Sequence, residues 1–89
     1  MSIEIIASKG NLPLKRLKTE KHHWYFEGEC NYDMINIIFN ISLEGGLKLR
    51  QGRNEHYVVL DDFKHKIKKK QGKKVIEFSG FLLKSLKYI

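Results

Sequence analysis

Large apolar residues alternate with polar ones along much of this chain, and the clearest case spans residues 34–43. Every second residue there is apolar, namely Ile35, Ile37, Phe39, Ile41 and Leu43, and the residues between them are mostly polar. A period of two is typical of a strand with one buried face, and Ile and Asn are poor helix formers. The pattern therefore predicts a strand over 34–43.

The segment before it follows the same rule. Trp24, Phe26, Gly28 and Cys30 fall on one face, and Tyr25 falls on the opposite, more polar face. Turn-forming residues occupy 31–33. Together the two segments predict a hairpin over residues 22–43.

Further strands are expected at 2–7, 47–50, 56–68 and 75–89, separated by turns at 45–46, 51–54 and 71–72. Asp61 and Asp62 interrupt the alternation of 56–68, which predicts a bulge or a single helical turn. Residues 8–21 are expected to form a basic connector containing the only proline, Pro13. Five or six strands with little helix predict one all-β, mostly antiparallel domain over 1–89, a small OB-like barrel or sandwich.

The charge of the chain narrows the classes of partner. The formal net charge is +7, from 17 Lys and Arg against 10 Asp and Glu. Such a surplus favours nucleic acid, an anionic membrane or an acidic protein. Lys outnumbers Arg 14 to 3, and Lys suits backbone phosphates rather than the two-pronged reading of bases. Weakly sequence-specific binding is therefore expected.

The location of the protein is expected to be cytoplasmic. Its single cysteine, Cys30, allows no intrachain disulfide and fits a reducing compartment. The N-terminus lacks the pattern of a signal peptide, and the apolar stretches are too short to span a membrane.

A run over residues 64–74 is the main candidate binding feature, because it contains seven lysines and no acidic residue. Phosphates bound there would relieve the repulsion between like charges and release counterions. The alternative is a solvated edge strand whose lysines prevent aggregation. The lysines of this run are Lys64, Lys66, Lys68, Lys69, Lys70, Lys73 and Lys74.

Two smaller basic clusters accompany this run. One comprises Lys15, Arg16, Lys18 and Lys21, and the other comprises Lys48, Arg50 and Arg53. Six of the ten acidic residues fall elsewhere in the sequence, at Glu27, Glu29, Asp33, Glu44, Asp61 and Asp62. This separation predicts a single positively charged face.

Two aromatic residues are candidates for stacking on bases. Tyr25 lies on the polar face of its predicted strand, and Phe81 lies opposite the apolar face of the last strand. Any base can stack on such a ring, which suits binding without sequence preference. The alternative is that both rings are buried in a small core.

Neither a metal site nor a catalytic group is predicted. The chain has no pair of Cys or His residues at metal-ligand spacing, and it has no Gly-rich phosphate loop. No cofactor is expected. His56 and His65 lie near the lysines in the sequence, which leaves a basic ribonuclease as an alternative.

Residues 57–89 resemble the fourth and fifth strands of bacterial single-stranded-DNA-binding proteins and the related primosomal B proteins, which are OB-folds. The matching features are a long strand, a basic loop closed by residues 71–74 and the final alternating strand VIEFSGFLLKSLKYI. In that family the loop contacts DNA, a role that the resemblance transfers to Lys66, Lys68, Lys69, Lys70, Lys73 and Lys74. This chain ends in Tyr88 and Ile89, where that family usually has an acidic tail.

Three functions remain open from the sequence. The first is a non-enzymatic module that binds single-stranded DNA or RNA through lysines and one or two stacking rings. The second is a small effector, as from a phage or mobile element, that binds an acidic host protein through its basic face or a β edge. The third is a basic ribonuclease toxin. A homodimer formed through an edge strand is compatible with each.

Overall fold

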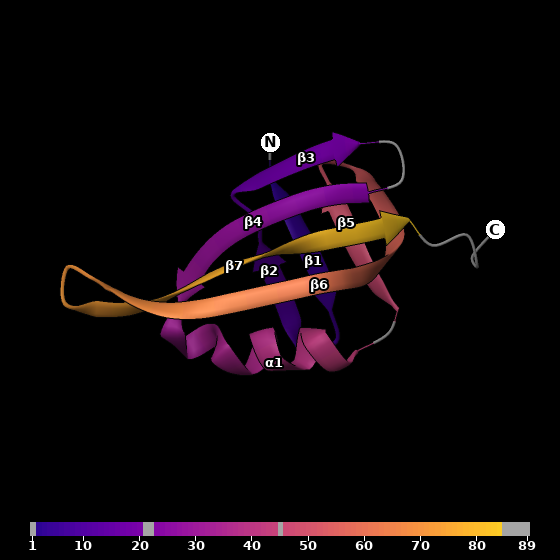
Figure 1. The fold of residues 1–89 in the computed structure, drawn as a ribbon. Coiled ribbons are helices and arrows are strands. Elements are labelled where there is room, and N and C mark those ends of the chain that lie inside the picture. The colour runs from indigo at the N-terminus through magenta and orange to yellow at the C-terminus, as the bar shows by residue number, and fades with distance from the viewer. Residues whose placement is uncertain (1, 21–22, 45, 85–89) are drawn as a thin grey trace.

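The computed structural model describes residues 2–20, 23–44 and 46–84, and strands dominate this part of the chain (Figure 1). Seven strands of the described residues form one antiparallel sheet in the order β2-β1-β5-β6-β7-β4-β3. The all-β, antiparallel fold class is confirmed. The elements are β1 (Ile3–Ala7), β2 (Gly10–Pro13), β3 (Arg16–Glu20), β4 (His23–Asn31), η1 (Tyr32–Met34), α1 (Ile35–Leu43), β5 (Leu47–Gln51), β6 (Asn54–Lys70) and β7 (Lys73–Lys84).

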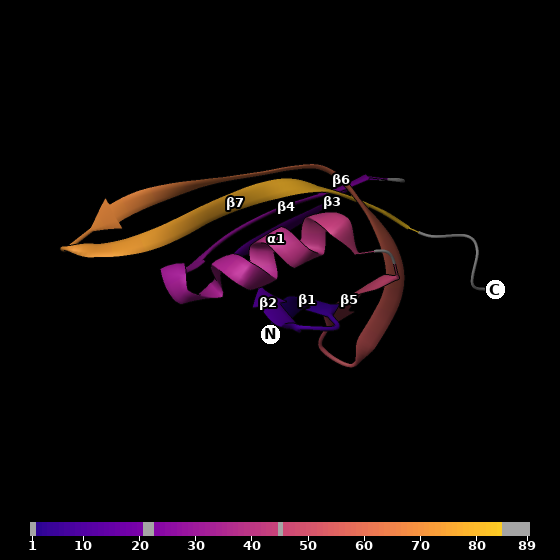
Figure 2. The ribbon, with the colours of Figure 1, turned by 90° about the horizontal axis from the view of Figure 1, so that it is seen from below.

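The sheet curls around α1. Figure 2 shows the helix between β3, β4 and β7 on one side and β1, β2 and β5 on the other, while β6 bends around between them. The two edge strands, β2 and β3, are joined by only Leu14 and Lys15, whose backbone N–H groups donate to Ile3 (2.8 Å) and Glu27 (2.9 Å). The edge strands do not pair with each other, so the sheet is not closed into a barrel.

The prediction of a strand over 34–43 is wrong, because this segment forms η1 and α1. Ile38 and Ile41, three residues apart, are fully buried, whereas Phe39 and Leu43 are exposed. β4 and β5 are not neighbours in the sheet, so the chain between them crosses its inner face, where a helix satisfies its own backbone groups. The predicted hairpin over 22–43 is therefore also absent, and β4 pairs with β3 and β7 instead.

The basic connector predicted over 8–21 is also replaced by regular structure. Most of its described residues belong to β2 and β3. Pro13 ends β2, an edge strand, where the lack of an N–H costs no interstrand hydrogen bond. Of the apolar residues in this segment, Leu12 is fully buried in the core and Leu17 packs against it.

The predicted irregularity at residues 61–62 is a β-bulge. The pairing of β6 with β7 shifts between Asp61 and Lys64, and Asp62 has a positive φ of 51°. The bulge turns Phe63 toward the inner face, where its ring stacks on Phe26 at a centroid distance of 6.0 Å. It also returns Lys64 to the outer face, so the alternation of lysines beyond it is preserved.

Two reciprocal pairs of phenylalanine and glycine hold β4 against β7. Phe78 lies opposite Gly28, and Phe26 lies opposite Gly80. A Cβ at Gly28 would lie 2.3 Å from Cζ of Phe78, and one at Gly80 would lie 3.1 Å from the ring of Phe26. Each ring therefore fills the space left by the glycine on the other strand. The buried core as a whole comprises Ile5, Leu12, Phe26, Ile38, Ile41, Leu47, Leu49, Val58, Ile76, Phe78 and Leu82.

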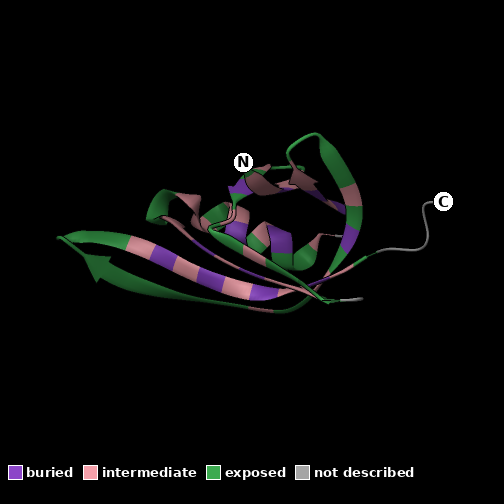
Figure 3. Cartoon of the chain, turned by 90° about the horizontal axis from the view of Figure 1, so that it is seen from above, coloured by how far each residue is buried: buried purple, intermediate pink, exposed green. Residues whose placement is uncertain are grey.

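The end of the β6–β7 hairpin forms an arm, defined here as residues 69–74. β4 pairs with β7 only as far as Val75, so the arm projects beyond the rest of the sheet (Figures 1 and 3). Gln71 and Gly72 form the predicted turn, both with positive φ. The predicted alternation of β7 is confirmed from Ile76 to Leu82, and residues 85–89 lie outside the described part of the chain.

A double-mutant cycle tests the Gly28–Phe78 contact. We expect Gly28→Ala to lower the free energy of unfolding by about 1–3 kcal/mol, because the added methyl group overpacks the ring. The same change in a Phe78→Leu background should cost clearly less, since the ring atoms are gone. Urea denaturation of the four proteins measures both costs. Equal costs in the two backgrounds, and so no coupling energy, would contradict the contact.

Candidate functional site

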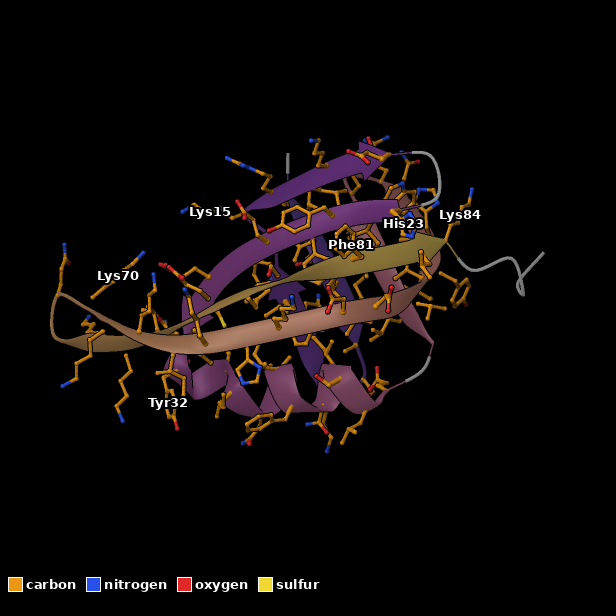
Figure 4. The ribbon with its side chains drawn as sticks, viewed as in Figure 1. Lys15, His23, Tyr32, Lys70, Phe81 and Lys84 are labelled. Carbon is orange, nitrogen blue, oxygen red and sulfur yellow. The ribbon has the colours of Figure 1, made fainter. Side chains whose placement is uncertain are left out.

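The outer face of the sheet, which points away from α1, carries a pair of aromatic rings. Tyr25 and Phe81 lie directly opposite each other on β4 and β7, and their rings meet edge to face at 5.4 Å between centroids. Both are half-buried and accessible from solvent. His23 adds a third ring, 6.1 Å from Phe81 (Figure 4). His23 was not among the predicted stacking residues, although alternation places it on the same face as Tyr25.

Lysines of β6 continue this face toward the arm. Lys64, Lys66 and Lys68 lie opposite Ser79, Glu77 and Val75 of β7, so they share the outer face as predicted. Between the rings and the arm the face is hollowed into a groove of about 430 Å³. The groove is lined by Lys15, Tyr25, Glu27, Gly28, Glu29, Lys64, His65, Lys66, Lys70, Glu77, Phe78 and Ser79.

Carboxylates lie among these lysines, so the predicted positively charged face is not uniformly positive. Glu29 and Glu77 are direct cross-strand partners on β4 and β7. Lys70 reaches both, at 2.5 Å from Glu29 and 3.9 Å from Glu77. Lys68 and Lys66 approach Glu77 at 3.1 and 3.9 Å. The lysines thereby offset the repulsion that two opposed carboxylates would otherwise feel.

These contacts shift the ionisation of the groups involved. A hydrogen bond from Lys68 holds the pKa of Glu77 below its ordinary value, and the charges of Lys68, Lys66 and Lys70 act in the same direction. The hydrogen bond to Glu29 raises the pKa of Lys70, and the charges of Glu29 and Glu77 add to that effect. Both groups are therefore charged at neutral pH.

The first basic cluster of the sequence borders the same face. Lys15 lines the groove, as Figure 4 shows beside β4. Lys18 lies opposite Tyr25 in the pairing of β3 with β4. Arg16 contacts Glu27 at 3.5 Å, which places its guanidinium at the margin of the groove. Lys21 lies outside the described residues.

Arg50 and Arg53 of the second basic cluster lie away from this face. Arg50 is held by Glu4 and Glu55, each at 3.1 Å. Arg53 belongs to the turn before β6, at the opposite end of that strand from the arm.

Within the arm, Lys73 is exposed and pairs with Lys70, whereas Lys69 and Lys74 alternate to the helix side. There Lys74 lies 5.2 Å from the centre of the Tyr32 ring.

The groups that could serve catalysis are dispersed. His56 contacts Trp24 at a ring distance of 5.5 Å, and His65 contacts Phe39 at the same distance, so the two histidines have different surroundings. Burial raises the pKa of the Cys30 thiol, and Asp33 and Glu29 raise it further, which disfavours the nucleophilic thiolate. In the described ranges, no three His, Cys, Asp or Glu residues are grouped so as to hold a metal ion.

Comparison with known proteins gave no relative: no family model, curated protein or solved structure matches this chain. In the part of the chain that the structure describes, no helix is both long and apolar enough to cross a membrane.

The ion pair between Lys68 and Glu77 can be tested by titration. We expect Lys68→Met to raise the pKa of Glu77 toward its ordinary value, because the hydrogen bond that lowers it is removed. Since the pKa of Glu77 is lower in the folded state, its contribution to stability is present above the unfolded pKa and is lost as the pH falls through the folded pKa. NMR titration of the Glu77 carboxyl carbon measures the shift.

The matched control for this titration is Lys64→Met, because Lys64 pairs with Asp62 and not with Glu77. It should leave the midpoint of Glu77 unchanged. A midpoint that moves equally in both variants would show a general charge effect and would contradict the assigned pair.

Proposed function

We propose that this protein is a non-enzymatic module that binds single-stranded nucleic acid on the outer face of β3, β4, β7 and β6, with little sequence preference. The observation that carries the proposal is the Tyr25–Phe81 pair. These rings lie on the solvent side of the sheet, beside lysines, while the core on the other side is filled by different aromatic residues.

The rings account for the single-stranded preference. A base stacked on an aromatic ring contributes about 1–3 kcal/mol, and every base offers a face for it. Bases in a duplex already stack on one another and present only their edges in the grooves. Tyr25, Phe81 and His23 can therefore be covered by the unstacked bases of a single strand.

The lysines account for the weak sequence preference. Lys64, Lys66 and Lys70 line the groove next to the rings, and Lys15 lies across it. Ammonium groups on flexible stems bind phosphates as point charges and do not distinguish bases. The resemblance of residues 57–89 to the DNA-contacting hairpin of single-stranded-DNA-binding proteins favours the same ligand, DNA or RNA. The one cysteine, a free and half-buried thiol, fits a cytoplasmic protein.

The aromatic pair provides the direct test. We expect Phe81→Ala and Tyr25→Ala each to weaken binding of a labelled oligothymidine of about 30 nucleotides roughly five- to a hundredfold, which corresponds to one lost stacking interaction. Fluorescence anisotropy at two salt concentrations measures the affinity, and a duplex of equal length should bind more weakly. Urea denaturation should show that both variants are folded.

Phe39→Ala is the matched control, because Phe39 is an exposed phenylalanine on α1, on the other side of the sheet. It should bind the oligonucleotide as the unmodified protein does. Equal losses in Phe39→Ala and Phe81→Ala, or an affinity that does not change with salt, would overturn the proposal.

The carboxylates in the groove provide a test of opposite sign. We expect Glu77→Gln to strengthen binding of the same oligonucleotide roughly two- to fivefold, because Lys66, Lys68 and Lys70 no longer have to leave a carboxylate to reach a phosphate. Glu55→Gln is the control, since Glu55 pairs with Lys48 and Arg50 outside the groove. A similar gain in both variants would indicate only the change in net charge.

A further inference from the structure

β6 is much longer than β5, its neighbour on one side. β5 pairs only with Asn54 to Val58, whereas β6 continues to Lys70. Within the described residues, no strand pairs with that side of β6 beyond Val58. Alternate N–H and C=O groups of a strand point to each side of it, so this stretch presents an unpaired backbone edge beside α1 (Figure 1).

The side chains along this open edge are sorted by face. Lys64, Lys66 and Lys68 point to the outer face. Ile67, half exposed at 50%, points to the helix side together with His65, and Lys69 follows on that side where the strand enters the arm. Phe39 of α1 lies against His65 and is itself 52% exposed. A strand added to this edge would thus meet positive charge on one face and apolar surface on the other.

We propose that the open edge of β6 over residues 63–70 binds an extended segment of a partner protein in which acidic residues alternate with apolar ones. Successive side chains of a strand point to opposite faces, so the acidic residues would lie beside Lys64, Lys66 and Lys68. The apolar residues would lie over Ile67 and Phe39. Backbone hydrogen bonds would supply the rest of the attraction, as in other cases of strand addition.

The same charges disfavour a second copy of this chain as the occupant. Antiparallel pairing of two β6 edges would place the lysines of one copy beside those of the other, and like charges directly opposite are destabilising. Acidic residues of the partner also fit only the part of the edge that is far from β5. Toward β5 the edge leads into a groove of about 320 Å³ lined in part by Glu44 and Asp62, which would repel them.

This inference does not rest on the proposed nucleic-acid site, although the outer lysines are common to both. The peptide would use the backbone edge and the helix side, and it would leave the Tyr25 and Phe81 rings uncovered. Phe81→Ala therefore separates the two proposals, because it removes a stacking ring without altering the edge.

The experiment uses the whole chain and a capped peptide of about ten residues, the upper end of common strand lengths, in which Glu alternates with Val. NMR and amide hydrogen exchange report on residues 63–70. We expect alternate amides of this stretch to exchange about tenfold more slowly, or slower still, in the presence of saturating peptide. The Phe81→Ala variant should respond in the same way.

Controls separate strand addition from simple charge attraction. Two versions of the peptide, N-methylated on one or the other set of alternate residues, keep the charge but block opposite backbone edges, so only one should lose binding. A peptide in which Lys alternates with Val should not bind. The double variant Lys66→Glu, Lys68→Glu should bind the Glu-Val peptide more weakly than the unmodified protein does. Binding of both methylated peptides without amide protection would overturn the proposal. So would concentration-dependent dimerisation that protects the same amides without peptide.

Discussion

The close packing of β4 on β7 through Phe78 over Gly28 and Phe26 over Gly80 is the constraint on which the rest of the structure depends. A side chain in place of either glycine would hold the ring away from the opposite strand. With the rings lying over the glycines, the centre of the inner face is filled without a second sheet. A single short helix is then enough to cover the remaining apolar surface, through Ile38 and Ile41.

The chemistry of the outer face follows from that filled inner face. Strand residues alternate between faces, so Tyr25 and Phe81, next to the packed phenylalanines and glycines, must point outward. Their rings contact each other and His23, and the hydroxyl of Tyr25 donates to Glu27 at 3.2 Å, but no helix or second sheet covers them in the described structure. The bulge at Asp62 extends this order to β6, since without it Lys64, Lys66 and Lys68 would point to the helix side.

Alternation in the sequence was sufficient to predict most of the strands, an irregularity at residues 61–62, the hairpin turn and the outward direction of Tyr25 and Phe81. It failed at 34–43, where Ile35, Ile37, Ile38 and Ile41 fit both a strand and a helix. The low helix propensity of Ile and Asn favoured the strand. What decides in favour of α1 is the position of this segment between two strands that are not neighbours, and strand order cannot be read from a single sequence.

The distribution of charge was missed for the same reason. Lys66 and Glu77 face each other across the predicted hairpin turn, but Glu29 is far from both in the sequence and becomes their neighbour only because β4 pairs with β7. The resulting face is basic but carries its own counter-charges. A small anion that displaces one carboxylate from one lysine gains little, because one ion pair replaces another. A polyanion differs, because its linked phosphates can engage several lysines at once and release counterions. The internal carboxylates therefore favour ligands with closely spaced charges over isolated anions.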